Sequence, residues 1–169
     1  MKKILFLLSM TMIALNLNAQ QSEVSNSSER EALKAEGWFD IGLPSGTLWK
    51  PILEIGNGTE YCSYDQAVQK YWHNLPTQEQ FEELVNSCKW TTSGTAIVAE
   101  GPNGVSFPLM PGGAVTCDGE FFAVGSLGGY WSKTPFDDEK AVYICFSGTN
   151  IQISNIDKCM HFPILLVRK

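Results

Sequence analysis

The sequence predicts one domain of short β-strands joined by turns and interrupted by two helices. From Gly37 onward, short apolar runs alternate with Gly, Pro, Asn and Asp, the pattern of strands and tight turns. Two later segments carry helix-capping residues followed by apolar residues at helical spacing. The chain has 169 residues, of which 44% are hydrophobic and 18% charged, which indicates one globular domain rather than a disordered chain.

Residues 1–19 have the composition of a secretory signal peptide. Lys2 and Lys3 precede an apolar run over residues 4–15, and the small residue Ala19 marks the predicted cleavage site. The run is too short to cross a hydrocarbon core of about 30 Å, and no later segment is apolar enough to do so. We therefore expect an exported protein without a membrane span, either periplasmic or at the extracellular or outer-membrane surface.

The charge of the remaining chain limits its partners. Without residues 1–19 it carries 10 basic and 18 acidic residues, a net charge of −8, which excludes nucleic acid as an expected partner. Residues 20–36 are polar and predict a flexible lead-in, within which Ser28 and Glu31 favour at most a short helix. The folded domain is expected to span residues 37–169.

Two helices are predicted from capping boxes, in which a Ser or Thr is followed three residues later by Gln. The first begins after Ser63, with Gln66 as its partner, and the second begins after Thr77, with Gln80. In the first helix the predicted buried face is Ala67, Val68, Tyr71 and Trp72. In the second helix the predicted buried stripe is Phe81, Leu84, Val85 and Cys88.

Three strand regions follow. Residues 95–100 and 105–110 flank a Gly-Pro-Asn-Gly turn and predict a hairpin. Residues 141–146 alternate between two faces, and residues 151–153 can return antiparallel to them beyond a glycine. Residues 164–167 are apolar on both faces, which predicts an interior strand.

Residues 110–138 predict a long irregular stretch that presents a ligand-binding surface. They are rich in glycine and aromatic residues and show few periodic signals, and long loops of this kind are usually functional. Trp131 is expected in the core. Phe122, Tyr130 and Phe136 are the candidates for exposed rings that hold a ligand.

Four segments in order resemble a known family: FDIGLPSGTLWK, LPTQEQFEELVNSCKW, GPNGVSFPLMPGG and GGYWSKTP. Together they resemble the Fibrobacter succinogenes major paralogous domain of Bacteroidetes, which is similar to C-type-lectin-like domains. The resemblance implies a compact α+β domain with two helices and a twisted antiparallel sheet whose first and last strands pair. It also implies export from an anaerobic, gut-type bacterium. The chain departs from the family pattern at His73 and Asn74, and in its last residues, 162–169.

No cofactor or metal is expected. The Glu-Pro-Asn or Gln-Pro-Asp and Trp-Asn-Asp triplets of calcium-dependent lectins are missing from the sequence. Asp137 and Asp138, with nearby Glu139, could offer oxygen ligands to a cation, but adjacent acids more often form a solvated loop. Binding is therefore expected to be independent of calcium.

The five cysteines, Cys62, Cys88, Cys117, Cys145 and Cys159, can pair in an exported protein, but their connectivity cannot be read from the sequence. Cys88 and Cys145 resemble buried small hydrophobes. Cys159 and His161 would share one face of a strand, and a cryptic hydrolase built on them is a remote alternative.

The leading hypothesis is a non-enzymatic binding module whose loops at residues 110–138 bind a glycan or a protein. The candidate ligand-binding residues are Phe122, Tyr130, Phe136, Asp137 and Asp138. The alternative is a structural or assembly subunit of a cell-surface complex, suggested by the polar, acidic lead-in and by the missing ligand triplets.

Overall fold

The computed structural model describes residues 28–29, 31–51 and 60–169. The chain divides into two compact units between Gly37 and Trp38. In the first unit, residues 28–29 and 31–35 are helical, so this part of the polar lead-in has more regular structure than its composition suggests. The predicted signal peptide, residues 1–19, lies outside the described residues. Every element named below belongs to the second unit.

The second unit contains two helices and twelve short strands among its described residues. The helices are α2 (Tyr64–Tyr71) and α3 (Gln78–Ser87). The first six strands are β1 (Leu48–Pro51), β2 (Cys62–Ser63), β3 (Lys89–Ser93), β4 (Ala96–Glu100), β5 (Ser106–Leu109) and β6 (Ala114–Val115). The others are β7 (Phe121–Phe122), β8 (Gly128–Pro135), β9 (Lys140–Ser147), β10 (Asn150–Asp157), β11 (His161–Phe162) and β12 (Leu165–Arg168).

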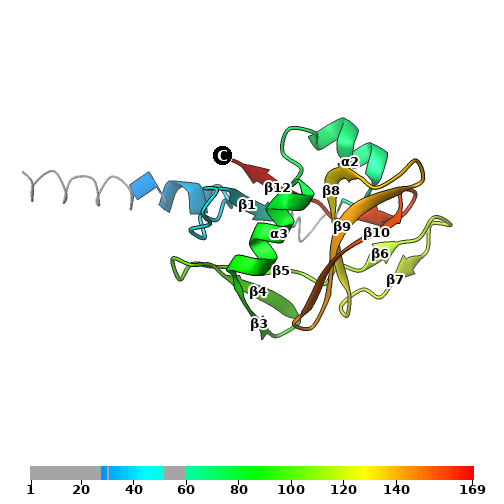
Figure 1. Ribbon diagram of the computed structural model, residues 1–169. Helices are drawn as coiled ribbons and strands as arrows, with labels where there is room; N and C mark the ends of the chain where they lie inside the picture. Colours follow the sequence, from blue (N-terminus) through cyan, green and yellow to red (C-terminus); the bar gives the residue numbers. More distant parts are fainter. Residues whose placement is uncertain (1–27, 30, 52–59) are drawn as a thin grey trace, which may run out of the picture. The chain divides into compact units, whose positions relative to one another are not determined.

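All pairings between these strands are antiparallel, so the unit is a mixed α+β structure (Figure 1). The strands form four small sheets with the orders β1-β12, β10-β9-β8, β2-β11-β6-β7 and β3-β4-β5. The first and last strands pair, as the resemblance implies. The single twisted sheet that it also implies is divided into these four.

Both predicted capping boxes are present. The Ser63 side chain accepts from the Gln66 backbone N–H at the start of α2, and Thr77 does the same for Gln80 at the start of α3. The apolar stripe of α3 packs as predicted, with Phe81 and Leu84 fully buried. In α2, Trp72 was expected on the buried face. It instead caps the helix after its last residue, Tyr71, and is 49% exposed, because the buried face of α2 ends with the helix.

The predicted hairpins are also present. Strands β4 and β5 pair across the Gly-Pro-Asn-Gly turn, and β9 and β10 pair across a turn that contains Gly148 at a φ of 55°. A positive φ of this kind suits glycine because it has no Cβ. Strand β10 extends to Asp157, beyond the short run that the sequence pattern indicates.

The sheet of β8, β9 and β10 separates two hydrophobic clusters. The first cluster includes Tyr130, Ile144 and the apolar stripe of α3, which contacts all three strands. The second cluster includes Trp131 and packs against α2, with Tyr143 at its edge. Because neighbouring residues of a strand point to opposite faces, β8 and β9 are apolar on both sides.

The same arrangement explains the last strand. Leu165 and Val167 belong to the first cluster, whereas Ile164 and Leu166 pack with the second. The sequence predicted an interior strand from this two-sided pattern, and Ile164, Leu165 and Val167 are buried. Within the described residues β12 pairs only with β1, so this buried strand has a neighbour on one side alone. Its two apolar faces reflect two cores rather than two neighbouring strands.

The prediction that residues 110–138 form one irregular stretch is also wrong. Gly128–Pro135 is the regular eight-residue strand β8, and only the segment before it forms a loop built on the small β6–β7 hairpin. The aromatic pattern of β8 showed no alternation because both of its faces are buried. No helix in the described part of the chain is long and apolar enough to cross a membrane.

Candidate binding site

The structure does not bring the five predicted site residues together. Tyr130 was expected to be exposed, and this is wrong: it is fully buried in the first cluster. Its hydroxyl donates to the Met110 carbonyl at 3.2 Å, and burial raises the pKa of the phenol. A ring in this position supports the core and cannot stack on a ligand.

Phe122 and Phe136 are exposed as predicted, but they lie at opposite ends of β8. Phe122 lies beside Gly128, where the strand begins, and Phe136 follows Pro135, where it ends. Eight strand residues span roughly 23 Å. The two rings therefore belong to different surfaces.

Asp137 and Asp138 build the turn between β8 and β9. The Asp137 carboxylate accepts from the backbone N–H groups of Glu139, at 2.8 Å, and Lys140, at 2.6 Å. The Lys158 ammonium donates to the backbone carbonyls of Asp137 and Asp138. The described residues contain no cluster of three or more His, Cys, Asp or Glu side chains that could hold a metal ion. The Asp137 carboxylate therefore has a structural role that requires no ligand, whereas Asp138 takes part in the turn through its backbone carbonyl.

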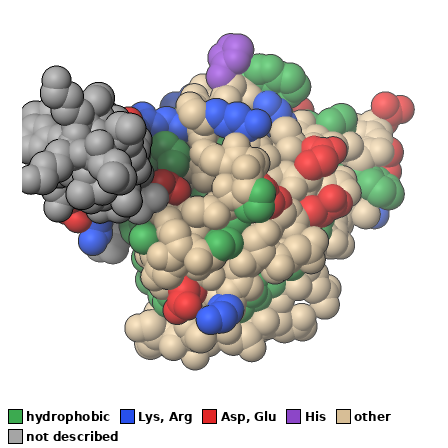
Figure 2. All heavy atoms as spheres, turned by 60° about the vertical axis from the view of Figure 1, so that its left-hand side comes forward, with side chains coloured by type: hydrophobic (Ala, Val, Ile, Leu, Met, Phe, Trp, Pro, Cys, Tyr) green, Lys and Arg blue, Asp and Glu red, His purple; other side chains and the backbone are tan. Residues whose placement is uncertain are grey.

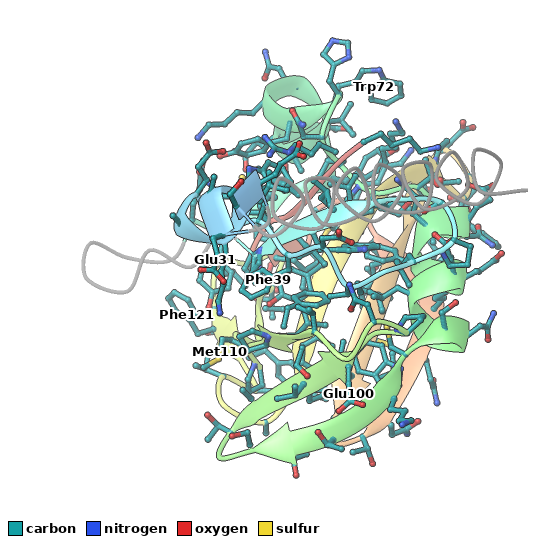
Figure 3. The ribbon with its side chains drawn as sticks, turned by 90° about the vertical axis from the view of Figure 1, so that its left-hand side faces the viewer. Glu31, Phe39, Trp72, Glu100, Met110 and Phe121 are labelled. Atoms are coloured by element: carbon teal, nitrogen blue, oxygen red, sulfur yellow. A yellow bond between two sulfur atoms is a disulfide. The ribbon has the colours of Figure 1, made fainter. Side chains whose placement is uncertain are left out.

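Three exposed apolar side chains lie on or just after β7 in the β6–β7 hairpin, namely Phe121, Phe122 and Val124, and we call them the apolar patch. Their exposed fractions are 68%, 55% and 59%. Phe121 and Phe122 are consecutive strand residues, so their side chains point to opposite faces of β7, and Phe122 is on the side of the pocket described below. Phe121 extends outward on this side of the molecule (Figure 3) and packs edge-on against Tyr61, with 5.4 Å between the ring centres. Of the three residues, only Phe122 was predicted from the sequence as a site residue. Val124 carries no signal of its own in the sequence.

An apolar pocket of about 170 Å³ adjoins the patch. The residues that line it include Phe122, Leu127, Tyr143, Ile156 and Phe162. Pockets for drug-sized ligands are usually about 300–1,000 Å³. This pocket is therefore suited to a single apolar group, such as one large side chain.

The backbone beneath the patch is tightly constrained. Ala123 has a φ of 53°, the only positive φ of a non-glycine residue in the described part of the chain. Its carbonyl accepts from the backbone N–H groups of Ser126, at 3.1 Å, and Leu127, at 3.0 Å. At Gly113, φ is 70°, and a Cβ there would collide with the Phe122 carbonyl oxygen. Strained backbone of this kind persists where its surroundings fix it, and it is common at ligand sites.

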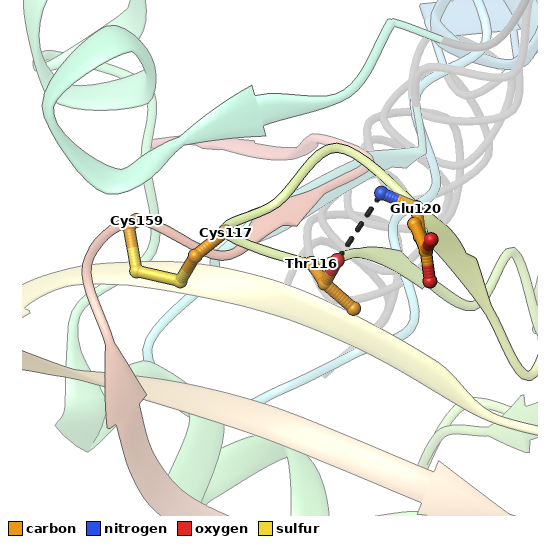
Figure 4. The surroundings of a disulfide bond; sticks show 4 residues. All are labelled: Thr116, Cys117, Glu120 and Cys159. Carbon is orange, nitrogen blue, oxygen red and sulfur yellow. Dashed lines mark hydrogen bonds between the residues drawn. A yellow bond between two sulfur atoms is a disulfide. The ribbon is translucent and has the colours of Figure 1, made fainter.

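A disulfide anchors the hairpin to the rest of the unit. Cys117 pairs with Cys159, which lies between β10 and β11 (Figure 4). In the same turn the Glu120 backbone N–H donates to the Thr116 hydroxyl at 3.1 Å. The hairpin thus presents its exposed side chains from a cross-linked base.

The disulfide also removes the hydrolase dyad suggested by the sequence. A cysteine nucleophile must be a free thiolate, and the sulfur of Cys159 is bonded to Cys117. His161 lies in β11 with its Nδ1 buried and without a hydrogen-bond partner in the described structure. The Cys159–His161 arrangement expected of a cryptic hydrolase is therefore contradicted.

The remaining cysteines in the described residues are Cys62, Cys88 and Cys145. Cys62 is buried, whereas Cys88 and Cys145 are half-buried rather than fully buried as expected. Burial, with the nearby Glu60 charge, raises the pKa of the Cys62 thiol to about 11. Burial also raises the pKa of Cys88 to about 11. Neither thiol is activated as a nucleophile.

The raised pKa values of Cys62 and Cys88 predict that both thiols are alkylated slowly. At pH 8, a thiol of pKa about 11 is about a hundredfold less ionised than one at the ordinary value near 9, so Cys62 and Cys88 should react with iodoacetamide about a hundredfold more slowly than free cysteine. Peptide mapping by mass spectrometry measures each site. The urea-unfolded protein is the control and should react rapidly. Fast labelling of either residue in the native protein would contradict the assigned environments.

Comparisons with protein families, with curated proteins and with solved structures found no match to this chain. Its function is therefore inferred from its own surfaces.

Proposed function

We propose that the chain is an exported, non-enzymatic binding module that uses the apolar patch to hold a partner protein. The observation that carries this proposal is the pairing of three exposed large apolar side chains with an adjoining apolar pocket. Exposed large apolar side chains are unfavourable in water, and where several gather beside an apolar pocket they indicate an interaction site. Of the two ligand classes expected from the sequence, a glycan and a protein, the patch favours the protein.

The chemistry of the pocket supports this choice. A neutral sugar needs hydrogen-bond partners around its hydroxyls, whereas the pocket is walled by side chains such as Phe122, Leu127, Ile156 and Phe162. Its volume of about 170 Å³ fits one apolar side chain inserted from a partner. Anchors of that kind dominate the energy of many protein interfaces.

The constrained backbone of the β6–β7 hairpin also supports a protein partner. A surface already held in its binding conformation loses little conformational entropy when a partner docks. The Cys117–Cys159 disulfide, the close approach at Gly113 and the hydrogen bonds to Ala123 all restrict the hairpin before binding. We propose that the hairpin is a preformed platform rather than a flexible loop.

The proposal also covers the location of the protein and the type of fold to which its scaffold belongs. A disulfide is typical of an oxidising compartment, which agrees with the signal-like composition of residues 1–19. We propose a periplasmic or surface location and a C-type-lectin-like scaffold of the major paralogous type. The antiparallel pairing of β1 with β12 supports that scaffold.

The proposal predicts that random peptides displayed on phage and selected on the purified protein will share a large apolar anchor residue. Phe122→Ser should weaken binding of a selected synthetic peptide by about tenfold or more, because it removes a wall of the pocket. Phe136→Ser is the matched control. Its ring is 60% exposed but lies at the other end of β8, so peptide affinity should not change. Isothermal titration calorimetry gives each Kd.

Several outcomes would contradict this proposal. Equal loss of affinity in Phe122→Ser and Phe136→Ser would show that the binding is unspecific. If neutral glycans bind the protein and Phe122→Ser abolishes that binding, the ligand of the patch is a sugar and not a protein. Self-association of the wild-type protein, abolished by Phe122→Ser in analytical ultracentrifugation, would replace it with a second copy and favour the assembly-subunit alternative.

A further inference from the structure

A second surface of the unit carries an open cleft of about 680 Å³. Its walls come from the end of β12, from β8, from the connection between α2 and α3, and from the start of α3. Its lining includes the cationic side chains of Lys133, Arg168 and Lys169 and the imidazole of His73. Figure 2 shows a histidine with Lys and Arg side chains gathered beneath it. We call this the cationic cleft.

The cationic cleft contrasts with the charge of the whole chain, which is −6. Two carboxylates, Glu79 and Glu83, also line it from α3, so the cations that could meet an anionic group are those on β8 and at the end of β12. Glu83 accepts from the Ser45 backbone N–H at 2.8 Å and from the Ser45 hydroxyl. Backbone donation at the start of α3 lowers the pKa of Glu79. Within the described residues, neither Lys133 nor Lys169 forms a salt bridge.

An aromatic ring lies beside these cations. Trp72 is 49% exposed and immediately precedes His73. The Lys133 ammonium lies over its ring, 5.6 Å from the centre. The backbone of Lys133 is fixed, since its N–H donates to the Pro76 carbonyl at 2.8 Å and its carbonyl accepts from the Tyr64 hydroxyl at 2.8 Å. The indole therefore lies next to an ammonium that lines the cleft.

We propose that the cationic cleft binds an acidic saccharide, with Lys133, Lys169 and His73 around its anionic group and Trp72 against the flat face of its ring. The cleft volume lies within the range usual for small-molecule sites. Lys133 and Lys169, which form no salt bridge in the described part of the chain, favour an anionic ligand, and an exposed indole favours one with a flat apolar face. An acidic peptide meets the first requirement and lacks the sugar ring. A neutral sugar leaves the cations unused.

This site is separate from the apolar patch: Figure 3 shows Trp72 and Phe121 on different parts of the molecule. The inference therefore stands or fails independently of the proposed protein partner. The anionic group of the saccharide can be a carboxylate or a sulfate. Polysaccharides that carry one or the other group distinguish the two.

The test is affinity electrophoresis of the purified protein in gels that contain polygalacturonate, dextran sulfate, neutral dextran or poly-glutamate. We expect retardation by polygalacturonate, by dextran sulfate or by both, and none by dextran or poly-glutamate. Trp72→Ala and Lys133→Ala should each weaken the retarding affinity by about tenfold. Lys89→Ala is the matched control: it removes one exposed lysine from β3, outside the cleft, and affinity should stay unchanged.

Four results would overturn the inference. Two of them are retardation by neutral dextran and retardation by poly-glutamate as strong as that by the acidic saccharides. The third is an equal loss of saccharide affinity in Lys89→Ala and Lys133→Ala. The fourth is the absence of retardation by any of the polymers. Unchanged affinity in Trp72→Ala would contradict the ring contact. Because Trp72 and Lys133 are at least partly exposed, their variants are expected to fold, which circular dichroism checks.

Discussion

Replacing Trp131 with alanine is expected to lower the free energy of unfolding by about 4 kcal/mol, a large share of the total for a domain of this size. Trp131 is fully buried in the second cluster. Its ring packs edge-on against Phe162 and Tyr64, with ring centres 5.0 and 5.6 Å away. Its indole N–H donates to the Cys62 carbonyl at 3.0 Å. Alanine would leave a cavity and remove the indole hydrogen bond to the Cys62 carbonyl.

Urea denaturation followed by circular dichroism measures this loss. Trp131→Phe keeps most of the ring but not the donor, so it should lose about 1–3 kcal/mol and remain measurable if the alanine variant does not fold. Trp72→Ala is the matched control. This exposed tryptophan should change stability by about 0.5 kcal/mol or less. Equal losses at both tryptophans would contradict the assignment of the second cluster.

Removing the disulfide is expected to have an effect of similar size. Cys117 and Cys159 are separated by 42 residues in the sequence. The chain-entropy model assigns a cross-link of this length about 4 kcal/mol, through the unfolded state. The double variant Cys117→Ser, Cys159→Ser should therefore unfold at clearly lower urea concentration. It should also bind the selected peptide more weakly, because the base of the β6–β7 hairpin is no longer held.

The control for the disulfide is Cys88→Ser, which changes one half-buried free thiol without breaking a cross-link. It should cost about 1 kcal/mol or less and leave peptide binding unchanged. A double variant as stable as the wild type, with unchanged peptide affinity, would show that the cross-link neither stabilises the unit nor organises the hairpin.

Local signals in the sequence predicted local structure well. Each capping box places a Ser or Thr and a Gln three residues apart, and both helices begin where these pairs indicate. The Gly-Pro-Asn-Gly turn likewise determines the β4–β5 hairpin. These predictions succeed because the interactions involved join residues close together in the chain.

Long-range packing could not be read from the sequence. The consecutive aromatics Tyr130 and Trp131 resembled an irregular loop because their alternation disappears when both faces of β8 are buried. These residues can be recognised as part of a strand only when it is known that Tyr130 packs in one hydrophobic cluster and Trp131 in the other. The apolar patch depends in the same way on a tertiary cross-link, since the pairing of Cys117 with Cys159 was one of several connectivities that the sequence allowed.

If the β6–β7 hairpin and its pocket form the protein-binding surface, a bound peptide must protect the backbone around them. Hydrogen–deuterium exchange of the whole protein, with and without the selected peptide, measures this protection segment by segment. We expect added protection to concentrate in residues 111–127 and 156–162, which flank the pocket. Protection concentrated instead at residues 133–140, around Phe136 and the β8–β9 turn, would show that the partner binds elsewhere.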